Sequence, residues 1–141
     1  MIPRTDERGG APAVEAAIVA GILGLLVAFT VAGVRVAAAE SATEQAARAA
    51  ARLASIQRQP AGAATVATTA AREALSARGV RCTALDVGVD VSSTPALGAA
   101  AEVRAEVVCD VPWSDLGIPG IRGTHRSRAT ATSSIDPLRE R

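Results

Sequence analysis

The longest apolar run in the chain lies close to its start. From Ala16 to Val34 there are 19 consecutive residues without a charge, mainly Ala, Val, Leu, Ile and Gly. As a helix rising about 1.5 Å per residue, this run is roughly 28 Å long, close to the ~30 Å hydrocarbon core of a bilayer. A helix that is apolar on every side has no polar face to turn to water. We therefore predict a membrane-spanning helix over residues 11–34.

The helical pattern continues beyond the apolar run. Residues 35–57 contain no Gly or Pro and are rich in Ala, the strongest helix former. Charged residues recur every four positions on one face, and small or apolar residues recur at intervals of three and four on the other. The charged face holds Glu40, Glu44, Arg48 and Arg52, and the other face holds Ala42, Ala46, Ala49, Leu53 and Ile56. We expect one helix of about 45 residues, half in lipid and half outside it.

Residues 58–141 follow as a small separate domain. Pro60 and Gly62 interrupt the first helix. A second helix is expected over residues 63–78, with Gly79 as its C-terminal cap. Its inward side chains are predicted to be Val66, Ala70 and Leu75, and its outward ones Arg72, Glu73 and Arg78.

The sequence period then changes from helical to two. Apolar and polar residues alternate over residues 85–91 and 101–107, which predicts a β-hairpin with one buried face. A third strand is expected within residues 124–135, and residues 112–123 are expected to be loop. The predicted fold class is α+β: a long N-terminal helix, a second short helix and a small antiparallel sheet of about three strands.

The two cysteines, Cys82 and Cys109, are predicted to form a disulfide between the first two strands. Pairing them directly would put apolar and charged side chains on the same face of the sheet, so we expect a β-bulge at Ala84–Leu85. The bulge would place Leu85, Val87, Val89 and Val91 opposite Val107, Ala105, Val103 and Ala101.

Composition argues against several classes of function. All 15 basic residues are Arg and the net charge is +1 with both signs interspersed, so the charge pattern indicates neither nucleic acid nor anionic lipid as a partner. His125 is the only histidine and is expected to be an exposed residue at a strand end. Two cysteines are too few for a structural zinc site and too far apart for a CxxC redox motif. Gly117, Gly120 and Gly123 lack the spacing of a phosphate-binding loop. We expect no enzymatic activity, metal, cofactor or small-molecule substrate.

One charged residue stands at the edge of the apolar run. Glu15 precedes it directly, and a carboxylate at membrane depth costs a few kcal/mol, so it usually has a function and a partner. The alternative is a solvated carboxylate at the membrane interface. Gly10 followed by Ala11, with Glu15 as the fifth residue after the glycine, resembles the processing site of type IV prepilins.

The similarity extends over about residues 7–57. RGGAPAVEAAIVAGILGLLVAFTVAGVRVA, followed by the Ala- and Arg-rich EQAARAAARLAS, resembles the TadE-like pseudopilins of the tight-adherence (Tad) pilus. Two residues depart from the family pattern: Ala16 stands where many relatives carry Phe or Tyr, and Pro12 lies just after the expected cut.

This resemblance implies a leader at residues 1–10, cut between Gly10 and Ala11 by a prepilin peptidase. It also implies that Glu15 pairs with the new amine of a neighbouring subunit. The expected partners are other pilins or pseudopilins, the Tad secretion machinery and membrane lipid. The protein would cross the cytoplasmic membrane once, with its N-terminus on the cytoplasmic side and its C-terminal domain outside the cytoplasm, where it could reach the cell surface as part of a pilus.

Other interpretations remain open at this point. Arg4 and Arg8 precede the apolar run while Arg35, Arg48 and Arg52 follow it, so charge alone does not decide the orientation. Ala37-x-Ala39 could be a signal-peptide cleavage site, although the apolar run is longer than the usual h-region and Arg35 lies between that run and the site. A single-span protein whose outer domain binds an envelope or extracellular partner without filament assembly is the alternative function.

Overall fold

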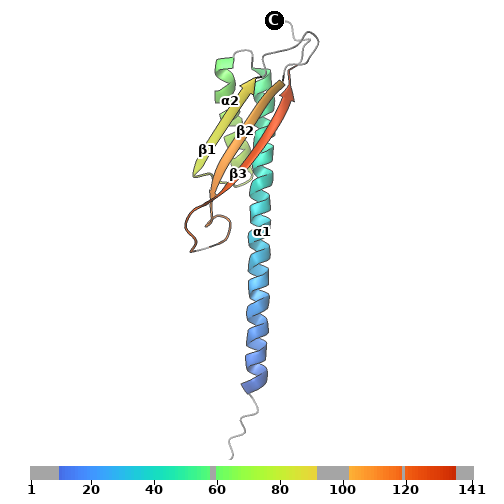
Figure 1. The fold of residues 1–141 in the computed structure, drawn as a ribbon, viewed down its shortest axis with the longest axis vertical. Helices are drawn as coiled ribbons and strands as arrows, with labels where there is room; N and C mark the ends of the chain where they lie inside the picture. The colour runs from blue at the N-terminus through green and yellow to red at the C-terminus, as the bar shows by residue number, and fades with distance from the viewer. Residues whose placement is uncertain (1–9, 58–59, 92–101, 119, 136–141) are drawn as a thin grey trace, which may run out of the picture.

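The protein is a long helix that carries a compact group of secondary structure on its C-terminal half (Figure 1). This computed structural model describes residues 10–57, 60–91, 102–118 and 120–135. The predicted α+β arrangement is confirmed, with the helices α1 (Gly10–Ile56) and α2 (Pro60–Ala77) and the strands β1 (Ala84–Val91), β2 (Glu102–Pro112) and β3 (Thr124–Ser134). We call residues 12–34 of α1 the shaft. The rest of α1, together with α2 and the three strands, is called the head.

Helix α1 is continuous from the shaft into the head. Pro12 lies in its first turn, where backbone N–H groups have no acceptor within the helix, so the proline costs the helix no hydrogen bond. Burial begins in the head with a stripe of small side chains: Ala39, Ala42, Thr43, Ala46, Ala47, Ala50, Ala51 and Ala54. This buried stripe coincides only in part with the small and apolar face found in the sequence, because Leu53 and Ile56 are 40% and 44% exposed and Ala49 is only half-buried. Small side chains allow the neighbouring elements to approach α1 more closely than a Leu or Ile would.

Helix α2 packs along the head part of α1 and also contacts β1. Its buried residues are Ala63, Ala67, Ala70, Ala71 and Leu75, whereas Val66 is only half-buried. The helix ends as predicted at Gly79, which has a φ of 70°. The N–H groups of Gly79 and Val80 donate to the carbonyls of Ser76 and Leu75 at 2.9 and 3.0 Å, which is a Schellman cap.

The three strands form an antiparallel sheet in the order β1-β2-β3. One face packs against the helices, with α1 contacting β2 and β3. Alternate residues of the central strand are buried on that face: Val103, Ala105, Val107, Cys109 and Val111. The opposite face carries charged and hydroxyl side chains, as the alternation in the sequence predicts.

The predicted strand register was wrong by two residues. Leu85 lies opposite Cys109 and Val91 opposite Val103, and Ala84 and Leu85 belong to the regular ladder, so no bulge separates them. An offset of two keeps every side chain on its predicted face, because side chains alternate with a period of two. The break in alternation lies instead at a bend at Thr83, whose N–H and hydroxyl both donate to the Asp110 carbonyl, at 2.8 and 2.9 Å.

Candidate functional site at the membrane-proximal end of the head

The shaft exposes its apolar side chains in all directions. Of its residues only Ala32 is even half-buried, and large side chains such as Val31 and Phe29 are 47% and 70% exposed. Contiguous apolar surface of this extent is uncommon on soluble monomers. The shaft is therefore long and apolar enough to span a membrane.

The proposed processing residues lie at the free end of α1. The helix begins at Gly10, so the Gly10–Ala11 bond belongs to its first turn. Glu15 is exposed near this end and has no ion-pair partner among residues 10–57, 60–91, 102–118 and 120–135. Cleavage and the pairing of Glu15 with a neighbouring subunit stay predictions.

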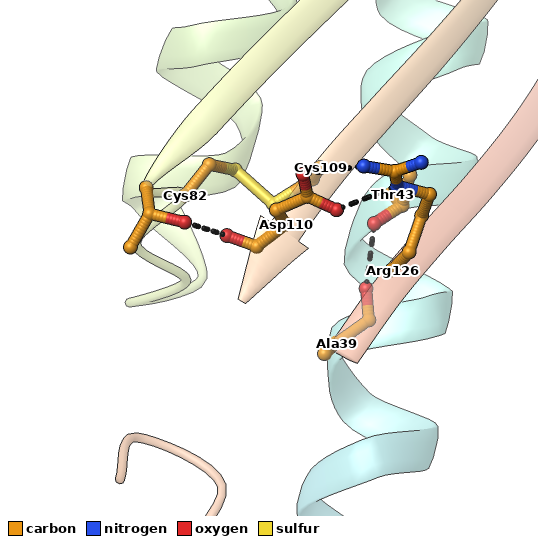
Figure 2. The surroundings of a disulfide bond; sticks show 7 residues. Ala39, Thr43, Cys82, Cys109, Asp110 and Arg126 are labelled. Carbon is orange, nitrogen blue, oxygen red and sulfur yellow. Dashed lines mark hydrogen bonds and ion pairs between the residues drawn. A yellow bond between two sulfur atoms is a disulfide. The ribbon is translucent and has the colours of Figure 1, made fainter. Parts of the chain in front are cut away.

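The structure contains the predicted bond between Cys82 and Cys109, whose Cα atoms are 5.3 Å apart (Figure 2). Cys109 is fully buried in a small core that also contains Ala39, Val111 and Leu116. This core lies at the end of the head nearest the shaft, since Ala39 is the first buried residue of α1. The disulfide therefore fixes the start of β1 and the end of β2 beside the point where the shaft enters the head.

A charged pair lies on the outer face of the sheet next to the disulfide (Figure 2). Arg126 donates from Nε and Nη2 to the two carboxylate oxygens of Asp110, at 2.8 and 3.0 Å. The hydrogen bond from Arg126, with its positive charge, holds the pKa of the Asp110 carboxyl below its usual range. The same pairing raises the pKa of Arg126. The pair links β2 to β3, on which the two residues lie directly opposite each other.

The segment between β2 and β3, residues 113–123, lies beside the top of the shaft (Figure 1). We call it the β2–β3 loop. It opens with a turn in which the N–H groups of Leu116 and Ile118 both donate to the Trp113 carbonyl, at 3.2 and 3.1 Å. Gly117 ends that turn with a φ of 83°, and a Cβ there would lie 3.3 Å from Cδ of Arg35. Arg35 in turn donates to the Asp115 carbonyl at 3.2 Å.

Two cavities flank this contact between the loop and Arg35. The upper cavity, of about 200 Å³, is lined by Arg35, Arg78, Arg81 and Asp115 together with small apolar side chains. The described residues that line the lower cavity, of about 230 Å³, are Leu25, Ala28, Phe29, Ala32, Gly117 and Ile118. Neither cavity could be predicted from the sequence, because the walls of each come from segments that are 30 or more residues apart in the chain.

His125 differs from its predicted exposed position. Its side chain is 24% exposed, its ring centre is 5.5 Å from that of Trp113, and its Nε2 lies 3.6 Å from a Glu40 carboxylate oxygen. That nitrogen has no hydrogen-bond partner in the part of the chain that the structure describes. The same part of the chain holds no group of three or more metal-ligating side chains.

No family model, curated protein or solved structure matches this chain. The features that need a function are the exposed shaft, the terminal Gly10–Glu15 segment and the junction between shaft and head.

Proposed function

We propose that this protein is a membrane-anchored structural or assembly component of a Tad-type pilus, a TadE-like pseudopilin without catalytic activity. The observation that carries the proposal is the continuity of α1. One helix provides both the exposed apolar shaft and the buried alanine stripe that holds the head together. A pilin-like subunit uses its helix in both ways, to sit in the membrane and to pack against other subunits.

Two further observations support this proposal. The motif of Gly10, Ala11 and Glu15 lies in the first two turns of the same helix, and Glu15 is exposed there, where a neighbouring subunit could reach it. The head is closed by a disulfide, and such bonds persist in oxidising compartments, which favours an extracytoplasmic head and a cytoplasmic N-terminus.

The test is the N-terminus of the protein extracted from membranes, with and without a co-expressed prepilin peptidase. We expect it to begin at Ala11 when the peptidase is present and before residue 11 when it is absent. Gly10→Val should prevent the cut, because the larger side chain fills the space that a glycine-selective site leaves. Gly21→Val is the matched control: it makes the same change on the open surface of the shaft and should be cut normally.

Two results would argue against the proposal. An N-terminus before residue 11 in the presence of an active peptidase would favour the single-span protein that binds an envelope partner without filament assembly. Equal processing of the Gly10→Val variant would show that the cut does not depend on the prepilin-like motif.

A further inference from the structure

The two cavities at the junction of shaft and head have opposite chemistry. The upper one brings together three guanidinium groups from two segments: Arg35 follows the apolar run on α1, and Arg78 and Arg81 belong to the connection between α2 and β1. Asp115 is the only acidic residue among the described residues of its wall, so these residues carry a positive excess. The lower cavity begins one helical turn further down α1, and none of the described residues that line it is charged.

The arginines retain most of their hydrogen-bonding capacity. A guanidinium has five N–H donors. Arg35 donates to the Asp115 carbonyl and Arg78 donates to the side chain of Gln45. Arg81 is exposed and makes no such contact with any residue that the structure describes. Most of these donors are therefore available to an anion with several oxygen atoms, such as a phosphate group.

The depth of the two cavities is fixed by the shaft. Arg35 is the first charged residue after the apolar run, so it lies at the boundary between hydrocarbon and headgroups when the shaft spans a bilayer. Phe29 lies six residues below it, about 9 Å deeper along the helix. The upper cavity is thus at headgroup level and the lower one faces the outermost part of the acyl chains.

We propose that this junction binds one anionic phospholipid, with its phosphate in the upper cavity and the start of an acyl chain in the lower one. The contact between Arg35 and Gly117 separates the two, so the glycerol backbone would pass beside it. A bound lipid would join three segments of the head to the membrane surface. The proposal requires the shaft to be in a membrane but does not depend on pilus assembly, so the N-terminal processing result leaves it unaffected.

Native mass spectrometry of the full-length protein in detergent tests this proposal by counting bound lipids. Dioleoyl phosphatidylglycerol is titrated against dioleoyl phosphatidylcholine, and we expect one phosphatidylglycerol to bind preferentially. A basic residue near an anionic lipid contributes about fivefold to binding, so Arg35→Gln/Arg78→Gln/Arg81→Gln should weaken it on the order of 100-fold.

The matched control removes three other exposed arginines, with Arg52→Gln/Arg72→Gln/Arg104→Gln. Arg52 lies about 25 Å beyond Arg35 along α1, more than two screening lengths at physiological salt, so this variant should keep the phosphatidylglycerol preference. For the lower cavity, Ala32→Leu should fill the space and reduce binding, while Val27→Leu, on the other side of the shaft, should not.

All variants are first checked for membrane insertion by flotation and for folding by thermal denaturation. If the triple variant fails either check, Arg81→Gln alone is used, because Arg81 holds no other described residue in place; it should weaken binding about fivefold. Equal binding of the two lipids by the wild type, or equal losses in both triple variants, would overturn the proposal. Water-soluble glycerol phosphate binding as tightly as phosphatidylglycerol would show an anion site without an acyl chain and would also overturn it.

Discussion

Removing the disulfide is expected to destabilise the head strongly. The bond closes a loop with a sequence separation of 27 residues. In the chain-entropy treatment of cross-links, a loop of this length lowers the entropy of the unfolded chain enough to contribute about 3.5 kcal/mol at 25 °C. In a domain of this size each kcal/mol shifts the midpoint of thermal unfolding by about 4–8 °C. Reduction, or the double variant Cys82→Ala/Cys109→Ala, should therefore lower the Tm by about 15–25 °C.

The single tryptophan makes this measurement local. Trp113 packs against the small core that contains Cys109, so its fluorescence reports on unfolding at the place where the bond acts. The assay is a thermal melt of the detergent-solubilised protein with and without a reductant, following Trp113 emission.

A packing variant separates the cross-link from the side-chain contacts. Val107→Ala removes two methyl groups from a fully buried position in the larger core and should lower the free energy of unfolding by about 1–3 kcal/mol. Because it keeps both cysteines, it should still show the full drop in Tm on reduction. If reduced and oxidised wild-type protein unfold within a degree of each other, the cross-link does not stabilise the head and the loop-entropy reasoning is refuted.

Three other variants test separate parts of the molecule. Glu15→Ala should leave membrane insertion intact, since a costly carboxylate is removed, but should abolish co-purification with pilus components; undiminished co-purification would make Glu15 a simple interfacial carboxylate. Pairing with Arg126 lowers the pKa of Asp110, so the pair stabilises the head fully at pH values above the ordinary carboxyl pKa. This stabilisation is lost as the pH falls through the lowered pKa of Asp110. The Tm difference between wild type and Asp110→Asn should thus shrink below about pH 4, and a constant difference would contradict it. Gly79→Ala should lower the free energy of unfolding by about 1 kcal/mol because of the positive φ alone, since nothing lies within 4 Å of the added methyl group. The control Gly62→Ala, also in open space but in α2, should be neutral or slightly stabilising, and an equal loss in both would exclude the conformational explanation.

The elements of the fold could be predicted because each has a local signal. The long α1 follows from an apolar run joined to an Ala-rich stretch without Gly or Pro, and the end of α2 follows from Gly79. The strands follow from alternation, which also requires a break between Cys82 and Leu85. Alternation fixes which face a residue occupies but not its partner, so a register shifted by two residues satisfies it equally well.

The packing details were less predictable for a related reason. Leu53 and Ile56 are the most apolar residues at the end of α1, and hydrophobicity alone places them inward. The observed interface uses alanines instead, because close approach of three elements to one helix favours small side chains over large ones. The junction between shaft and head depends on contacts such as that of Arg35 with Asp115, which are 80 residues apart in the chain and leave no periodic trace in it.

The β2–β3 loop also limits the directions from which another membrane helix can approach. The loop stands against the side of the shaft that carries Leu25, Phe29 and Ala32. Since successive residues of an α-helix are about 100° apart around its axis, Leu23, Val27 and Val34 lie on the opposite side. Near the head, a neighbouring helix can therefore approach that open side but not the side that the loop covers. Because α1 has no break between shaft and head, the direction in which a head points also fixes which side of its shaft is covered, so neighbouring molecules that pack by their shafts are restricted in how their heads can be rotated.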